Sequence, residues 1–328
     1  MTVAHRVLIL GSLAAAGCTP NNSGSTLAAC RVLSAPSGAA APPAWGGSVF
    51  TIVMENKSRG QILRPGGPAF INQLAQRGAT ADRYHDTFVH PSEANYLWMV
   101  AGENFGVLDD ADPASHHIAA TSHIVDQLER AGLSWKAYEE SMGAPCGLTS
   151  HGRYAAKHDP FVYFDDVNGW DGTEFHPQGR CADHVVDYRQ LDVDLASRSV
   201  PRYAFITPDL DHDMHDGSIA EGDAWLAREV PKILASDAFR HGGVLFLLWD
   251  EGGGTPANDD PPFLAISPHA RPGFASSADY DTSSYVKTVQ AVLGLDPLPC
   301  AGAAGEVSAM DELFSVPLAP EGAPEKGA

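Results

Sequence analysis

Positively charged side chains are scarce in this chain. Its 328 residues include 21 Lys and Arg against 41 Asp and Glu, which gives a formal net charge of −20 at pH 7. So acidic a surface repels nucleic-acid backbones and anionic lipids, and it excludes binding to either by bulk charge. An anionic ligand would therefore have to be attracted by local groups or by a bound cation.

Cysteine is also rare, with 5 residues in all and no CxxC spacing, which argues against a structural zinc knuckle. Setting Cys18 aside leaves Cys30, Cys146, Cys181 and Cys300, and an even number outside the cytosol favours disulfides. Three pairings are open. We expect Cys146 to pair with Cys181, and we expect Cys30 with Cys300 as a second pair that joins the two ends of the domain.

Long apolar runs are missing as well, and no stretch is suited to span a bilayer. Arg6 precedes a short apolar run over residues 7–16, a pattern typical of a signal peptide over residues 1–18. Ala15-Ala16-Gly17-Cys18 also resembles a bacterial lipobox, which would place a lipid anchor on Cys18. Simple secretion explains the pattern equally. We expect an extracytoplasmic protein, secreted or a cell-surface lipoprotein, with no transmembrane helix in its mature form.

The remaining sequence predicts one folded domain with flexible ends. Residues 19–45 are rich in Ala, Ser, Pro and Gly and are typical of a tether. Residues 46–318 form the predicted domain, and residues 319–328 are typical of a disordered tail. Residues 142–180 carry many Gly, Pro, Asp and aromatic side chains with little periodicity, which predicts an ordered insertion.

Within the domain, apolar runs typical of buried strands alternate with segments of helical period. The predicted strands are residues 48–54, 134–138, 202–207, 243–249 and 263–267. The predicted helices are residues 68–77, 121–131, 221–234 and 283–293. This alternation predicts an α/β fold with a mostly parallel sheet that is covered by helices on both faces.

The segment from His90 to Gly102 is the most informative feature of the chain. His90-Pro91 ends regular structure, because the residue before a proline is forced out of the helical region. Ser92 is then expected to cap a helix, where a phosphate would meet free N–H groups and the positive end of the helix dipole. The alternative is an ordinary capping serine without a chemical role.

Three polar clusters follow predicted core strands, at the edge where open α/β sheets place their sites. They are Glu55-Asn56-Lys57-Ser58, residues 208–217, and Asp250-Glu251 with three glycines. Each alone is compatible with an ordinary loop, and residues 211–216 are also compatible with a surface metal or calcium loop. Three clusters at one edge, together with Ser92, favour a functional site.

The residue types in these clusters suit phosphoryl chemistry. Glu55, Asn56, Asp250 and Glu251 supply hard oxygen donors for one divalent cation such as Mg²⁺, Ca²⁺ or Mn²⁺. Such a cation would activate the Ser92 hydroxyl.

Basic side chains suited to phosphate or to the leaving group lie in two further segments. Lys157, His158 and His215 are candidates to hold phosphate or to protonate the leaving oxygen. Four other histidines lack a flanking motif and are expected on the surface. They are His116, His117, His123 and His184.

Taken in order, five segments resemble a known family. They are Glu55 to Ser58, His90 to Tyr96, Lys157 to Phe161, Asp213 to Gly217 and Trp249 to Glu251. Together they are similar to the phosphoesterase family of bacterial acid phosphatases and phospholipases C, within the alkaline phosphatase superfamily. The resemblance covers roughly residues 48–315 and implies a three-layer αβα sandwich over the predicted 46–318 domain.

The resemblance also implies a role for each matching residue. It implies that Ser92 is a phosphorylated nucleophile and that His158 and His215 serve the phosphate or the leaving group. It places Asn95, Lys157 and Asp213 in substrate binding. It makes Glu55, Asn56, Asp250 and Glu251 the cation ligands.

Two departures from the family stand out. Many relatives carry a histidine before the last helix, where this chain reads Tyr280-Asp281-Thr282, which favours a single-cation site. Relatives often have a further acidic residue after Asp250-Glu251, where this chain has glycines, so Glu251 is expected to be the weaker ligand.

The resulting hypothesis is an exported phosphatase that cleaves phosphate monoesters through a phosphoserine with help from one cation. Its expected substrate is a phosphorylated small molecule or a phosphoinositide, and nucleic acid is not an expected partner. The alternatives are a phospholipase C-type phosphodiesterase and a non-catalytic lipoprotein that binds cations or a ligand.

Overall fold

The computed structural model describes residues 45–119, 122–253, 260–298 and 307–318. The predicted signal peptide, the Cys18 anchor, most of the tether, the Cys30–Cys300 pair and the tail lie outside these residues. Among the described residues, no helix combines the length and apolarity needed to cross a membrane.

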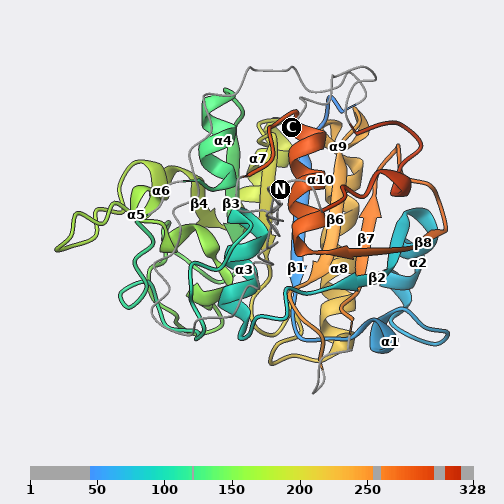
Figure 1. The fold of residues 1–328 in the computed structure, drawn as a ribbon, viewed down its shortest axis with the longest axis horizontal. Coiled ribbons are helices and arrows are strands. Elements are labelled where there is room, and N and C mark those ends of the chain that lie inside the picture. The colour runs from blue at the N-terminus through green and yellow to red at the C-terminus, as the bar shows by residue number, and fades with distance from the viewer. Residues whose placement is uncertain (1–44, 120–121, 254–259, 299–306, 319–328) are drawn as a thin grey trace, which may run out of the picture. The chain divides into compact units, whose positions relative to one another are not determined.

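One mostly parallel sheet organises the described chain (Figure 1). Its strand order is β4-β3-β5-β1-β6-β7-β2-β8. The strands are β1 Val49–Met54, β2 Ala79–His85, β3 Trp135–Glu139, β4 Val185–Asp187, β5 Tyr203–Thr207, β6 Val244–Trp249, β7 Phe263–Ile266 and β8 Phe274–Asp281. β7 pairs antiparallel with β6 and β2, and the other pairs are parallel.

Helices cover both faces of the sheet because consecutive strand residues point to opposite sides. In β1, Val49 and Val53 join one apolar cluster, whereas Phe50 and Ile52 join the other. The first cluster includes α3 Ser92–Ala101, α4 Ile124–Arg130 and α10 Thr282–Leu293. The second includes α2 Ala69–Arg77, α7 Arg189–Ser197, α8 Ile219–Ala235 and α9 Asp237–Arg240. The predicted three-layer αβα sandwich is confirmed.

The remaining helices are short. They are α1 Arg59–Ile62, η1 Ala156–His158, η2 Pro160–Tyr163, α5 Asp165–Asn168, α6 Arg180–His184 and η3 Asp311–Leu313. Three of them (η1, η2 and α5) lie within the predicted insertion, so it is ordered as expected. Cys146 and Cys181 form the predicted disulfide, with Cα atoms 5.4 Å apart.

The sequence prediction missed three strands and one boundary. β2, β4 and β8 are short or carry many polar side chains, so they lack the apolar runs by which the other strands were predicted. The tether was predicted to include Trp45, but this side chain is buried and donates a hydrogen bond to Pro317 O at 3.0 Å. The packed domain therefore includes residue 45.

Candidate active site

The carboxyl ends of β1 and β6 bring two predicted clusters together. β1 lies between β5 and β6, so the loops that follow these three strands are neighbours. The Asn56 N–H donates to Asp250 Oδ1 at 3.2 Å, and the Glu55 N–H donates to the Asp213 carbonyl at 2.8 Å. Segments almost two hundred residues apart in the chain thus share one edge of the sheet, as the sequence predicted.

Ser92 lies at this edge, but it does not cap its helix. Pro91 occupies the N-cap position and Ser92 is the first residue of α3, so the predicted capping role is wrong. The Ser92 side chain is instead directed to the acidic cluster, where Oγ donates to Glu55 Oε2 at 3.2 Å. Only 2% of Ser92 is exposed. Its hydroxyl is held by the Glu55 carboxylate rather than by the backbone of the helix.

Within the part of the chain that the structure describes, several buried atoms of the cluster make no aligned hydrogen bond, although the His158 nitrogens lie 3.2 Å from two of them. These atoms are Glu55 Oε1, Asp213 Oδ2, Asp250 Oδ2 and His158 Nε2. A buried carboxylate oxygen without a partner is costly, and each such group in a folded protein calls for an explanation. A divalent cation would satisfy these oxygens, and carboxylates are the donors that hard cations prefer. Glu55 and Asp250, two of the four predicted ligands, therefore have oxygens that fit a bound cation.

The raised pKa values of the carboxyl groups in the cluster also favour a bound cation. Burial and then the charge of Asp250 raise the pKa of Glu55 well above its ordinary value. Burial and then the charge of Glu251 raise the pKa of Asp250 to about 8. Burial likewise raises the pKa of Asp213 to about 8. These carboxyl groups resist ionisation together, and a bound cation would remove that resistance.

Glu251 is engaged differently from the other predicted ligands. Its carboxylate contacts His90 Nδ1 and accepts a hydrogen bond from Asn95 Nδ2 at 3.4 Å. Asn95 is buried one turn after Ser92, and its Nδ2 also donates to the Val89 carbonyl at 2.8 Å. Asn95 therefore ties the serine helix both to the preceding loop and to the end of β6.

The two predicted histidines lie side by side. His158 is buried, with Nε2 3.2 Å from Glu55 Oε1 and Nδ1 3.2 Å from Asp213 Oδ2. Its ring stacks on Tyr96 at 5.0 Å and lies 5.6 Å from the His215 ring. Burial and then the charge of Lys157 hold the pKa of His158 well below its ordinary value, so its imidazole is neutral.

Lys157 and His215 form the partly open side of the site. Lys157 Nζ lies 3.2 Å from His215 Nε2 and donates to Asp110 Oδ2 at 2.8 Å. His215 Nδ1 lies 2.8 Å from Asp216 Oδ1. All the predicted site residues thus belong to one connected set.

The sequence interpretation missed three residues that shape this set. Asp110 accepts from the Glu93 N–H at 3.2 Å and so joins α3 to Lys157. Lys57 Nζ donates to the Met214 carbonyl at 2.8 Å, which fixes the loop that carries Asp213. Tyr96 supplies the ring beneath His158. Lys57 and Tyr96 stand inside recognised motifs and could have been singled out, whereas nothing in the sequence marks Asp110.

The expectation that four histidines lie on the surface is wrong for His123. Its side chain is buried and contacts Asp166 at 3.1 Å. His116 is also largely buried, and its Nδ1 lies 2.7 Å from Glu93 Oε1. Both histidines pair with acidic groups that are distant in sequence. The residues next to each histidine therefore could not predict its burial.

Other clusters of candidate ligands are already satisfied. Asp209 accepts from Ser141 Oγ at 2.7 Å, and Glu140 accepts from Trp225 Nε1 at 3.0 Å. Arg153 contacts Asp211 at 2.9 Å and Asp216 at 3.2 Å. Asp211 and Asp216 therefore have a basic partner in this loop, whereas Asp213 belongs to the cluster beside Ser92.

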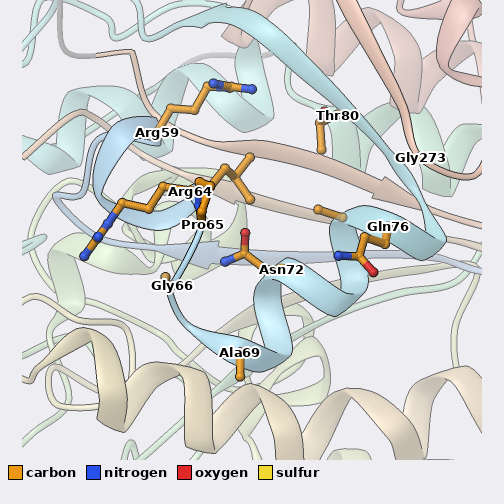
Figure 2. A pocket seen from close by; sticks show the side chains of 12 residues that line it. Arg59, Arg64, Pro65, Gly66, Ala69, Asn72, Gln76, Thr80 and Gly273 are labelled. Atoms are coloured by element: carbon orange, nitrogen blue, oxygen red, sulfur yellow. The ribbon is translucent and has the colours of Figure 1, made fainter.

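A surface pocket of about 560 Å³ lies apart from this site. Arg59 and Arg64 line it, but Figure 2 shows their guanidinium groups pointing in different directions. Arg59 also pairs with Asp82. None of the predicted site residues lines this pocket, and its two arginines do not converge on a common anion.

The αβα fold of this chain is also found in solved structures of the alkaline phosphatase superfamily. A superfamily member from Vibrio parahaemolyticus superposes with a TM-score of 0.55 at 13% identity, covering 84% of this chain and 74% of that one. A phosphonate monoester hydrolase from Silicibacter pomeroyi superposes with a TM-score of 0.55 at 9% identity, covering 84% and 78%. At such identities the likeness establishes the fold.

The chain belongs to the phosphoesterase family, whose model matches residues 61–296. It is 34% identical over 228 residues to a phosphatidylinositol-3-phosphatase from Mycobacterium tuberculosis, covering 69% of this chain and 70% of that one. It is 30% identical over 213 residues to a probable acid phosphatase from Kluyveromyces lactis, covering 62% and 47%. A non-hemolytic phospholipase C from Burkholderia pseudomallei is 26% identical over 219 residues, covering 60% and 30%. The chain thus spans about half or less of the yeast and Burkholderia proteins.

Proposed function

We propose that this protein hydrolyses phosphate monoesters through a phosphoserine at Ser92. The observation that carries the proposal is the contact between Ser92 Oγ and Glu55 Oε2, 3.2 Å long, within a cluster of buried carboxylate oxygens that make no aligned hydrogen bond. A serine is a weak nucleophile unless a neighbouring group removes its proton or a metal ion activates it. Ser92 is placed beside groups that suit both routes.

Glu55, Asn56, Asp250 and Glu251 are the proposed cation ligands, and Glu251 is the weaker one because His90 and Asn95 already occupy its carboxylate. When bound, a divalent cation supplies charge neutralisation for the phosphoryl oxygens and lowers the pKa of a coordinated hydroxyl. Glu55 orients the Ser92 hydroxyl before attack.

The basic side chains have separate proposed roles. His158 is buried and neutral, so it is suited to donating one hydrogen bond to a phosphoryl oxygen. Lys157 is the proposed contact for the remaining oxygens, and Asn95 positions the Glu251 carboxylate beside the substrate. Asp213 keeps the two histidines in place through His158 Nδ1 and the His215 N–H, the latter at 2.6 Å.

His215 is the proposed acid for the leaving oxygen. It is only partly buried, which gives the departing alcohol access to solvent, and Asp216 Oδ1 lies 2.8 Å from its Nδ1. As Ser92 Oγ bonds to phosphorus, its proton passes to Glu55 Oε2, the O–P bond to the alcohol breaks, and the alcohol takes the proton from His215. Water then attacks the phosphoserine and gives one proton to His215. The bond from phosphorus to Ser92 Oγ breaks, Glu55 returns the proton to Oγ, and inorganic phosphate leaves.

Two features support a more specific proposal for the substrate and for the cellular location. The mycobacterial relative acts, by its name, on phosphatidylinositol 3-phosphate, so we propose phosphoinositides as candidate substrates. The Cys146–Cys181 disulfide and the N-terminal pattern support a location outside the cytoplasm. A phosphodiesterase of phospholipase C type is the second candidate, because such an enzyme is also a relative.

The proposal is tested with p-nitrophenyl phosphate, bis-p-nitrophenyl phosphate and phosphatidylinositol 3-phosphate, each with and without chelator. Turnover of the monoesters that is lost with chelator and restored by a divalent cation supports the proposal. Preferential turnover of the diester favours the second candidate. No turnover of any substrate by a protein that binds cations would favour the non-catalytic alternative.

A further inference from the structure

Two large apolar side chains that are exposed to solvent lie in segments whose neighbouring residues contact the proposed active site. Among the residues that the structure describes, three such side chains are strongly exposed, Phe88 by 65%, Leu108 by 66% and Val193 by 56%. Single exposed apolar residues are ordinary on a protein surface. The position of Phe88 and Leu108 beside α3 sets them apart from Val193, which lies on α7.

Phe88 is held next to the site by its chain neighbours. Thr87 Oγ1 donates to Asn95 Oδ1 at 2.8 Å, and Asn95 Nδ2 donates to the Val89 carbonyl at 2.8 Å. Asn95 in turn contacts Glu251. The backbone on both sides of Phe88 is therefore fixed to the first turns of the serine helix.

The segment that carries Leu108 is also fixed to the start of that helix. Two residues later, Asp110 accepts from the Glu93 N–H at 3.2 Å and from Lys157 Nζ at 2.8 Å. The preceding residue, Val107, belongs to the apolar core. Leu108 therefore lies between the core residue Val107 and Asp110, which contacts the proposed phosphate-binding residue Lys157.

The backbone at Phe88 adds a second observation. Its φ is +54°, in the left-handed region that bulky side chains rarely adopt and that costs on the order of 1 kcal/mol. Phe105 has the same φ, but its ring packs against Phe164. The ring of Phe88 has a single ring neighbour, His85, with centroids 6.1 Å apart, so burial does not offset the strain. A strained and exposed phenylalanine beside a reactive group is better explained by function than by stability.

Acidic side chains surround both residues and limit what they could contact. The Phe88 N–H donates to Asp86 Oδ1 at 2.7 Å, and Asp109 and Asp110 directly follow Leu108. Negative charge on this side of the site repels an anionic group. The occupant that fits is apolar and uncharged.

We propose that Phe88 and Leu108 form an apolar rim that contacts apolar, uncharged parts of the substrate's alcohol and favours phosphate monoesters that present such a surface. The inference rests on the proposed phosphatase function. It assigns substrate selection to two residues outside the set that acts on the phosphate.

Monomeric n-alkyl phosphates from ethyl to octyl test the rim, with kcat/KM measured for each. In the wild-type protein kcat/KM is expected to rise with chain length, by up to about fourfold for each methylene that reaches the rim. A hexyl phosphate that ends in a carboxylate is expected to react more slowly than hexyl phosphate itself.

The double variant Phe88→Asn with Leu108→Gln removes the apolar surface and keeps side chains of similar length. Asparagine also tolerates a positive φ, so the variant is expected to fold. Its kcat/KM is expected to be independent of chain length, while kcat for ethyl phosphate stays within twofold of wild type. The control Val193→Thr is expected to keep the wild-type dependence.

The outcomes separate the two proposals. If the wild type cleaves ethyl phosphate but shows no dependence on chain length, the rim is refuted and the phosphatase proposal stands. The rim is also refuted if kcat/KM of the double variant still rises with alkyl chain length. It is likewise refuted if the only property that the double variant loses is binding to phosphatidylcholine vesicles. If no alkyl phosphate is cleaved at all, the phosphatase proposal itself fails.

Discussion

Serine side chains at the start of a helix usually accept a hydrogen bond from the first turn. Ser236 does so for α9, where its Oγ accepts from the Phe239 N–H at 3.1 Å. Ser92 makes no such bond in α3 and contacts Glu55 instead. These two serines therefore separate a structural role from the proposed chemical role.

Ser92→Ala is expected to lower kcat for p-nitrophenyl phosphate by about 10³-fold or more, because it removes the proposed nucleophile. Its free energy of unfolding is expected to stay close to wild type, since no cap is lost. Ser236→Ala is expected to keep activity and to lose about 1 kcal/mol of stability. Kinetics and urea unfolding of both variants measure this. Activity that survives Ser92→Ala would refute the nucleophile.

Asp250→Asn tests the proposed cation site. A divalent cation at about 100 times its Kd is expected to stabilise the wild type by about 2.7 kcal/mol, which raises Tm by several degrees. Asp250→Asn should lose most of this shift, whereas Asp209→Asn should keep it because the Asp209 oxygens already have protein partners. Thermal unfolding with and without cation measures the shifts, and equal shifts in both variants would contradict the assignment.

At the scale of single residues, the sequence predicted those polar site residues that directly follow a core strand or stand at the start of a helix. Glu55, Asp250 and Ser92 meet as expected. Asp110 could not be predicted, because its place in the site depends on contacts with Glu93 and Lys157, which lie 17 and 47 residues away in the chain.

At the scale of elements, prediction succeeded where burial is complete. β1, β5 and β6 are buried along their whole length, so their apolar runs were visible in the sequence. β8 lies at the edge of the sheet with exposed and buried residues in irregular alternation, and β4 has only 3 residues. Such strands are defined by their partners rather than by their own composition.

The insertion that carries Lys157 and His158 is closed by the Cys146–Cys181 disulfide, whose cysteines are 35 residues apart. A loop of that length stabilises the folded state by about 3–4 kcal/mol, mainly by restricting the unfolded chain. Replacing both cysteines by serine is therefore expected to lower the free energy of unfolding by about that amount. Urea unfolding of the double variant measures the loss, and a change below about 1 kcal/mol would show that the bond does not constrain the unfolded chain.

At the scale of the whole molecule, the excess of acidic residues makes buried carboxyl groups sensitive to pH. Glu93 follows the proposed nucleophile, and burial together with the charge of Asp110 raises its pKa to about 9, above its ordinary value of 4.5. The folded protein therefore holds a proton that the unfolded chain releases. Stability from this group is complete at pH values below 4.5 and is lost as the pH rises toward 9.

Glu93→Gln is expected to flatten the fall in stability between pH 4.5 and pH 9, because the amide does not ionise. One unit of pKa shift corresponds to about 1.4 kcal/mol, so even part of the effect is measurable. Glu221→Gln serves as the control. A hydrogen bond from the N-cap residue Ser218 lowers the pKa of Glu221, so the contribution of Glu221 to stability changes only at acidic pH. Urea unfolding across this range decides, and parallel profiles for wild type and Glu93→Gln would contradict the assignment.

The most direct measurement is a rapid acid quench during turnover of a phosphomonoester, followed by mass spectrometry of the peptide that contains residues 90–102. The account predicts one phosphate on Ser92 in the steady state, absent from Ser92→Ala. Turnover without any phosphorylated protein, or with the phosphate on another side chain, would contradict it.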